Sequence, residues 1–113
     1  MKHALFYGSL KQGEFNFDRF GEGSQKYIKT VTLDGYNLYD LSWYPGLTKG
    51  DGKVVVELHE VDDHAFENIK QMEAGAGYIE GKEKIDDVEA SIFFYKGNLK
   101  GKPLIQNGNW TGK

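Results

Sequence analysis

The sequence predicts an α+β protein whose strands form a small barrel or a strongly curved sheet. About six short runs of β-branched and aromatic residues are separated by turn residues. The chain contains 15 glycines, 7 tyrosines and 7 phenylalanines but only 2 prolines, which suits short strands joined by tight turns. A single segment has clear helical periodicity. A length of 113 residues suits one domain, so we expect residues 1–113 to form a single unit.

Composition excludes several classes of protein. The chain has no cysteine, which rules out disulfides and thiolate metal sites. Its net charge is −3 and its basic residues are scattered, so we expect no nucleic-acid partner. No apolar stretch approaches the length of a membrane span, and we expect no membrane contact. The first apolar run is too short for a signal peptide, which favours a cytoplasmic location.

The first predicted strand, residues 2–7, runs into a glycine-containing loop. Glycine tolerates positive φ and lets backbone N–H groups turn outward toward a ligand. A strand that feeds such a loop at the edge of a core can hold a small anionic group. The same pattern also suits a strand that simply turns, which the local sequence alone favours, and only features further along the chain support binding. The candidate binding residues are Tyr7, Gly8, Ser9 and Leu10.

Further strands are expected after this loop. A short helix is predicted over residues 14–20, where three phenylalanines supply apolar contacts. Asp34-Gly35 is a strong hairpin signal and should join two separate strands. The aromatic stretch 43–47 should form another turn. The predicted strands cover residues 27–33, 36–41, 53–60, 78–85 and 89–95.

One convincing helix is predicted over residues 62–74. Asp62 or Asp63 can cap its start, and Gly75 should end it. With an advance of about 100° per residue, its apolar side chains fall on one face, which should pack on the core. These side chains are Ala65, Phe66, Ile69 and Met72.

Glu73 is the exception to the pattern of this helix. It falls about 20° from Phe66 on the helical projection and therefore points inward. Partial desolvation and the negative end of the helix should both raise its pKa toward that of a general base near neutral pH. Alternatively, Glu73 swings out to solvent at a frayed helix end, and the local sequence does not decide between the two.

Other candidate residues have simpler interpretations. His59, Glu60, Asp62, Asp63 and His64 form a cluster of possible ligands without any recognised spacing, so we expect no metal site. Ser9 lacks a G-x-S-x-G elbow and a His–Asp pair, which favours a hydrogen-bonding loop residue over a nucleophile. Tyr78 is a core or rim tyrosine whose hydroxyl should lie near Glu73.

Three aromatic residues have two possible roles. Trp43, Tyr44 and Trp110 either stack on a sugar or base or close the hydrophobic interior. General burial of aromatic side chains favours closure.

Several motifs, in this order and spacing, resemble those of one family over most of the chain. They are Tyr7-Gly8-Ser9-Leu10 followed by Lys11, Gly13 and Asn16, then Gly35 to Asp40, Tyr44 to Leu47, Val56 to Asp63, Glu73 with Tyr78, and Gly108-Asn109-Trp110. Together they are similar to the gamma-glutamylcyclotransferase-like superfamily. The most similar branch contains gamma-glutamylamine cyclotransferase and the cyclotransferase of butirosin biosynthesis.

The resemblance implies a small mixed β-barrel of about six strands with one or two packed helices. It also implies a reaction, in which the free α-amine of a gamma-glutamyl compound attacks its own side-chain carbonyl and 5-oxoproline forms. Glu73 would act as general acid/base, while Tyr7, Gly8, Ser9, Leu10 and Tyr78 would bind the substrate. The expected partner is a small molecule with a gamma-glutamyl group, and the expected assembly is a monomer or homodimer. No cofactor and no metal are expected.

Two departures from the family pattern keep other functions open. Ile79 follows Tyr78 where a basic residue is frequent, and Phe17 follows Asn16 where histidine is frequent. The first departure suits a non-catalytic module that binds an amino-acid-like molecule. A third class is an aromatic-rimmed barrel that binds an oligonucleotide or a sugar. The net negative charge of the chain disfavours the oligonucleotide.

Overall fold

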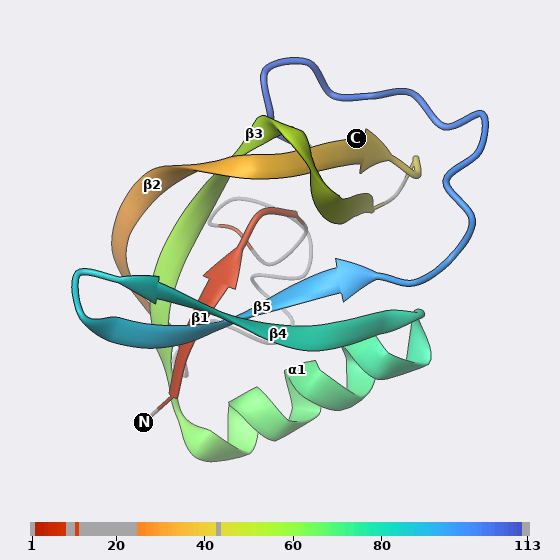
Figure 1. The fold of residues 1–113 in the computed structure, drawn as a ribbon. Helices are drawn as coiled ribbons and strands as arrows, with labels where there is room; N and C mark the ends of the chain where they lie inside the picture. The colour runs from red at the N-terminus through yellow and green to blue at the C-terminus, as the bar shows by residue number, and fades with distance from the viewer. Residues whose placement is uncertain (1, 9–10, 12–24, 43, 112–113) are drawn as a thin grey trace.

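The computed structural model describes residues 2–8, 11, 25–42 and 44–111. Within this part of the chain, five strands form one sheet and one helix packs beside it (Figure 1). The elements in chain order are β1 (Lys2–Phe6), β2 (Gln25–Asp40), β3 (Pro45–Val61), α1 (Asp63–Gly75), β4 (Tyr78–Ile85) and β5 (Val88–Tyr95). The predicted helix over residues 14–20 lies outside the described residues.

The sheet is mixed, with strand order β2-β3-β1-β5-β4. Two antiparallel hairpins, β2–β3 and β4–β5, form its two sides. β1 joins them in the middle, antiparallel to β3 and parallel to β5, with Ala4 opposite Ser91. The strand that leads to the predicted substrate loop is therefore held on both sides, which fixes the position of its last residues.

The hairpin predicted at Asp34-Gly35 is wrong. β2 runs through these residues without reversing, and its register with β3 shifts between Asp34 and Tyr36. Gly35 has φ +90° and lies opposite three residues of β3, 50–52, so these positions form a bulge in the long hairpin instead of a turn that ends a strand. The chain reverses later, where Ser42 has φ +84° and the N–H of Leu41 donates to Tyr44 O at 2.8 Å.

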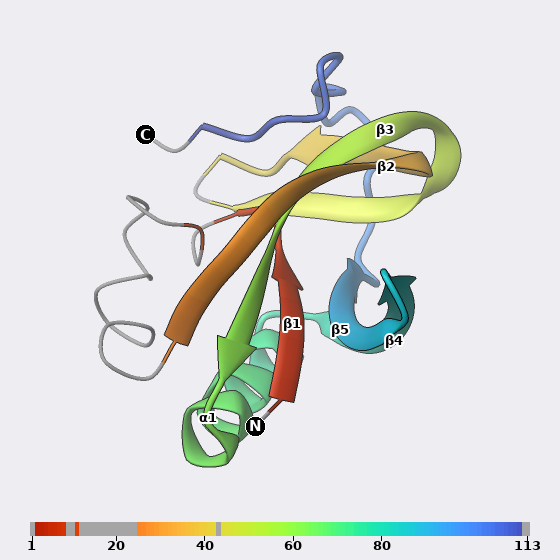
Figure 2. The ribbon, with the colours of Figure 1, turned by 90° about the vertical axis from the view of Figure 1, so that its left-hand side faces the viewer.

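The bulge also explains why the predicted six-stranded barrel is wrong. Two of the predicted strands are one bent strand, and the sheet is not closed by a backbone ladder in the described residues. The sheet is nevertheless strongly curled (Figure 2), and side chains of its two edge strands, β2 and β4, are in contact. The Tyr36 hydroxyl donates to the Glu83 carboxylate, and Lys29 pairs with Asp86 in the β4–β5 turn. The fold is therefore the strongly curved α+β sheet.

The core is divided between the two faces of the sheet. Inside the curl, one cluster includes Leu5, Leu38, Val56, Ile92 and Trp110. On the other face, a second cluster packs α1 against β1 and the ends of its neighbours through Ala4, Phe6, Phe66, Ile69 and Phe93. Successive side chains of β1 point to opposite faces of the sheet, so they pack alternately into the two clusters.

The predicted helix is confirmed. α1 begins after Asp62, whose carboxylate accepts the N–H of Ala65 at 2.7 Å, and it ends at Gly75. Ala65, Phe66 and Ile69 are buried, and Met72 packs against the same cluster. No helix in the described part of the chain is long and apolar enough to cross a membrane.

The segment after β5 crosses the outside of the bent hairpin. Ile105 N–H donates to Leu38 O, and Val55 N–H donates to Gly108 O, each at 2.8 Å. Trp110, two residues further, is buried in the core inside the curl. Hydrophobic closure is thus the role of Trp110, while Trp43 lies outside the described residues.

Candidate active site

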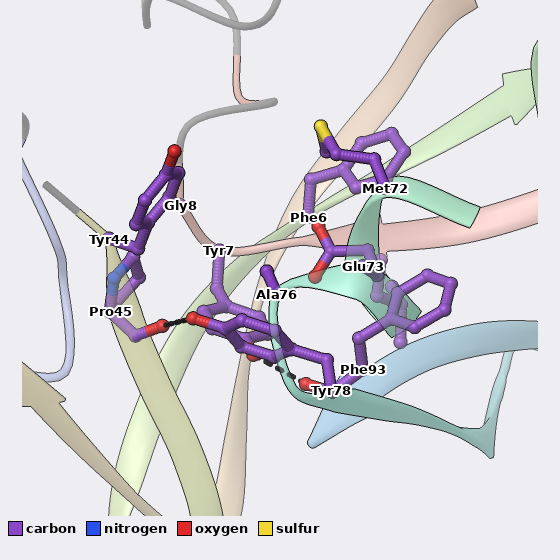
Figure 3. Close-up of a pocket in the computed structure, with 11 residues that line it drawn as sticks. Phe6, Tyr7, Gly8, Tyr44, Pro45, Met72, Glu73, Ala76, Tyr78 and Phe93 are labelled. Carbon is purple, nitrogen blue, oxygen red and sulfur yellow. Dashed lines mark hydrogen bonds between the residues drawn. The ribbon is translucent and has the colours of Figure 1, made fainter. Parts of the chain in front are cut away.

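A cavity of about 60 Å³ lies where β1, the start of β3, the last turn of α1 and β4 meet. Its lining is mostly apolar and aromatic, with one carboxylate (Figure 3). The lining residues are Leu5, Phe6, Tyr7, Gly8, Tyr44, Pro45, Met72, Glu73, Ala76, Tyr78 and Phe93. Most of the lining residues are buried, whereas Tyr44 and Ala76 are exposed and Met72 and Glu73 are half-buried.

Glu73 reaches the cavity because of its phase on α1. It follows Ile69 by four residues, so its side chain leaves the helix on the side that faces the sheet. Figure 3 shows the carboxylate directed from the helix toward the β1 side of the cavity. Burial raises the pKa of Glu73 from 4.5 to about 7. At neutral pH the group therefore populates both protonation states, as a proton carrier must.

Two tyrosine hydroxyls in the cavity are tied to backbone carbonyls. Tyr78 Oη donates to Pro45 O at 2.6 Å, and Tyr7 Oη donates to Phe93 O. Burial raises the pKa of both phenols well above the usual value, and the nearby Glu73 raises each further. Both side chains are neutral at neutral pH and brace the cavity walls. Tyr78 does lie in the same cavity as Glu73, and substrate binding by either tyrosine stays a prediction.

Gly8 is required here for close packing. A Cβ on Gly8 would lie 2.7 Å from Cδ of Pro45, which is nearer than side chains tolerate. Its φ is outside the left-handed region, so positive φ is not the reason for glycine at this position. The N–H of Lys11 donates to Gly8 O at 3.0 Å. Ser9 and Leu10, the other predicted loop residues, lie outside the described part of the chain.

The structure brings together four of the residues singled out from the sequence: Tyr7, Gly8, Glu73 and Tyr78. Sequence reasoning missed Pro45 and Phe93, because strand curvature, which no local pattern encodes, carries them to the cavity. Met72 was assigned to the core, and it also lines the cavity. For Tyr44, the sequence favours closure of the hydrophobic interior over stacking on a ligand. In the structure Tyr44 is 41% exposed and lines the mouth of the cavity.

The structure does not assemble the possible metal ligands between His59 and His64. Among the described residues, no group of three or more His, Cys, Asp or Glu side chains is placed to hold a metal ion. His59 is fully buried, and its ring contacts Gln25 Nε2 and Glu57 Oε1, each at 2.9 Å. Burial lowers the pKa of His59, although the Glu57 contact opposes this.

Comparison with known proteins gives consistent matches along the chain. Residues 4–112 match the family model described as "Gamma-glutamyl cyclotransferase, AIG2-like". A relative from Vibrio cholerae, named "Putative gamma-glutamylcyclotransferase", is 32% identical over 116 residues, covering 97% of this chain and 96% of the relative. The "Gamma-glutamylcyclotransferase family protein ytfP" of Citrobacter rodentium is 29% identical over 110 residues, covering 95% and 93%.

Solved structures share the fold. The crystal structure of an uncharacterized protein from Pyrococcus horikoshii superposes with a TM-score of 0.83 at 29% identity, covering 96% of this chain and 89% of the other. The solution structure of protein ytfP from Escherichia coli has a TM-score of 0.80 at 24% identity, covering 96% and 95%. The second likeness is one of fold alone.

Proposed function

The chain belongs to the gamma-glutamyl cyclotransferase, AIG2-like family, and on that premise we propose that it is an enzyme that releases 5-oxoproline from a gamma-glutamyl compound. The observation that carries the proposal is Glu73, a carboxyl with a pKa of about 7 that points into an apolar cavity beside Gly8. A carboxyl in such a place lowers stability, so a residue kept there at that cost is a candidate for function. A gamma-glutamyl amine or peptide that fits this cavity is the substrate class that we propose.

In the proposed reaction, the substrate's own α-amine is the nucleophile. Its nitrogen forms a bond to the γ-carbonyl carbon, and the bond from that carbon to the leaving amine breaks. Ionised Glu73 takes a proton from the attacking nitrogen and returns it to the leaving nitrogen. Protons therefore balance without another reactant. A pKa near neutral pH suits both steps, because Glu73 must accept a proton in the first step and donate it in the second.

The cavity would assist ring closure in two ways. It is small and mostly apolar, so a bound glutamyl chain has little room for extended conformations, and folding brings amine and carbonyl together. Backbone N–H groups of the loop that begins at Gly8 would stabilise the oxygen that becomes negative during attack. Tyr7 and Tyr78, tied to backbone carbonyls, would keep the walls in place during this process.

A second candidate function is a non-catalytic module that binds an amino-acid-like molecule. The observation in its favour is Ile79, which stands where family members often carry a basic residue. Ile79 is 48% exposed and is not part of the cavity lining. Binding of amino acids that is unchanged by Glu73→Gln, together with no turnover, would favour this module over the enzyme.

The deciding experiment is an assay of 5-oxoproline release from a panel of gamma-glutamyl amines and dipeptides. We expect turnover by the wild type and a loss of about 10²–10⁴-fold in Glu73→Gln, the usual scale of general acid–base catalysis. Glu67→Gln is a matched control, because Glu67 is exposed on the same helix. No release from any compound at high enzyme concentration, or full turnover by Glu73→Gln, would contradict the proposal.

A further inference from the structure

The buried side chain of Lys11 connects the cavity wall that contains Gly8 to the C-terminal segment, residues 96–111 after β5. Lys11 is only 7% exposed. Its backbone N–H donates to Gly8 O at 3.0 Å, and its ammonium donates to Trp110 O at 2.6 Å and to Asn109 Oδ1 at 3.0 Å. One residue therefore joins a cavity wall to a segment almost one hundred positions away along the chain.

The acceptors of Lys11 belong to a well-fixed part of the molecule. Gly108 O accepts the N–H of Val55 at 2.8 Å, so the segment pairs with β3 just before these acceptors. A Cβ on Gly108 would collide with Lys53 O, which shows how closely the two backbones pack. Trp110 is 3% exposed in the core inside the curl. The acceptors of Lys11 are thus attached to the sheet by backbone pairing at Gly108 and by burial of Trp110.

The contacts continue from Gly8 around the cavity. Gly8 packs on the Pro45 ring, and Pro45 O accepts the hydroxyl of Tyr78 at 2.6 Å. Tyr78 and Glu73 both line the cavity, and Figure 3 shows Gly8 across it from Glu73. A series of contacts therefore runs from the C-terminal segment through Lys11, Gly8 and Pro45 to Tyr78, beside the predicted base.

We propose that Lys11 is a positioning residue for the reaction, which acts by holding Gly8 at a fixed distance across the cavity from Glu73. This inference rests on the proposed function. Hydrogen bonds from an ammonium group are about twice as strong as neutral ones, so Lys11 resists displacement of the wall. A misplacement of about 1 Å in a binding wall can lower catalysis by about 10²-fold, although the reacting groups are unchanged.

The test is a kinetic series of single variants. Lys11→Met removes the ammonium that contacts Trp110 and Asn109, and we expect KM to rise about 10-fold or more, within the range given by misplacement. Asn109 is exposed, and Asn109→Ala removes one acceptor of the Lys11 ammonium and should raise KM by a smaller factor. Lys11→Arg keeps a positive charge that can donate hydrogen bonds, so its KM should lie between those of the wild type and Lys11→Met. Lys102→Met is the matched control, because Lys102 is exposed and does not line the cavity.

Two readouts separate positioning from a merely structural role. The pH at which the rate is half-maximal should be nearly the same in the variants and the wild type, since neither Lys11 nor Asn109 lines the cavity with Glu73. In a Glu73→Gln background, calorimetry with gamma-L-glutamylethylamide should show weaker binding on Lys11→Met and a smaller loss on Asn109→Ala. A lower melting temperature with unchanged KM and unchanged affinity would overturn the inference.

The same measurements distinguish this inference from the proposed function. If the wild type releases no 5-oxoproline but the Glu73→Gln protein binds the probe and loses affinity on Lys11→Met, the reaction is wrong and the positioning role stands. If turnover is normal and Lys11→Met changes neither KM nor affinity, the reaction stands and the positioning role is wrong. If neither turnover nor binding is detected, both are wrong.

Discussion

At the scale of single residues, Gly8 has the most demanding position in the candidate site. Any side chain there meets the Pro45 ring, whose carbonyl holds Tyr78. We expect Gly8→Val to reduce kcat/KM strongly and to destabilise the fold by about 1–3 kcal/mol, the usual cost of overpacking. Ser9→Ala should be milder if backbone groups hold the ligand. Kinetics and thermal unfolding of both variants test this, and the reverse order of effects would show that the loop acts through the Ser9 hydroxyl.

The pKa of Glu73 sets the pH dependence of the activity. The ionised carboxylate is the base in the proposed reaction, so kcat should rise with pH and level off above about 7. The measurement is a pH–rate profile under saturating substrate. The rising limb should be absent from the residual activity of Glu73→Gln, and a limb that persists in this variant would assign it to another group.

The same group links stability to pH with a definite sign. The pKa of Glu73 is about 7 when folded and near 4.5 when unfolded, so the folded state binds more protons between these values. The contribution of Glu73 to the free energy of unfolding should therefore fall as pH rises from about 4.5 to 7. Glu73→Gln removes this loss, and its advantage in melting temperature should grow over that window. An advantage that is constant with pH would contradict the assignment.

At the scale of elements, α1 shows where sequence is a sufficient guide. Its cap, its apolar face and the inward phase of Glu73 all follow from residue type and helical period, and each is observed. β2 shows the opposite. Asp34-Gly35 has the chemistry of a tight turn, but a glycine with positive φ also suits a bulge, and only the pairing with β3 decides between them.

The N-cap of α1 gives a prediction at this scale. Asp62→Ala removes the acceptor for Ala65 N–H and should lower stability by about 1 kcal/mol. Glu67→Ala, on the exposed face of the helix, is the comparison variant and should change stability much less. Urea unfolding of both proteins is the measurement. Because the cap is at the opposite end of α1 from Glu73, turnover per folded molecule should be retained.

At the scale of the whole molecule, the two sheet edges are joined by side chains where a barrel would have a ladder. Tyr36 is buried and donates to the Glu83 carboxylate, so Tyr36→Phe should cost roughly 1–2 kcal/mol. Lys29 and Asp86 are exposed, and Lys29→Met should cost less than about 1 kcal/mol. Denaturant unfolding of the two variants compares the contacts. A larger loss from Lys29→Met would mean that the exposed pair holds the edges together.

The candidate site could be predicted only in part, for reasons that belong to this scale. Glu73 and the loop at Gly8 have local signatures, in helical phase and in glycine chemistry. Pro45 and Phe93 reach the same cavity only because the sheet curls around β1, and curvature depends on pairings between distant strands. Lys11 belongs to the motif at the first loop, but its contact with the segment after β5 has no local signature, because its partners lie at the far end of the sequence.

The central place of β1 has a consequence for how the chain folds. The β2–β3 hairpin, α1 and the β4–β5 hairpin each pair residues near one another in sequence and can form early. β1 can pair with β3 earlier, but its pairing with β5, where Ala4 lies opposite Ser91, must wait until the last strand is available. During synthesis, the two sides of the sheet therefore stay unjoined until β5 has emerged. The cavity, which needs β1, α1 and β4 together, is among the last features to form.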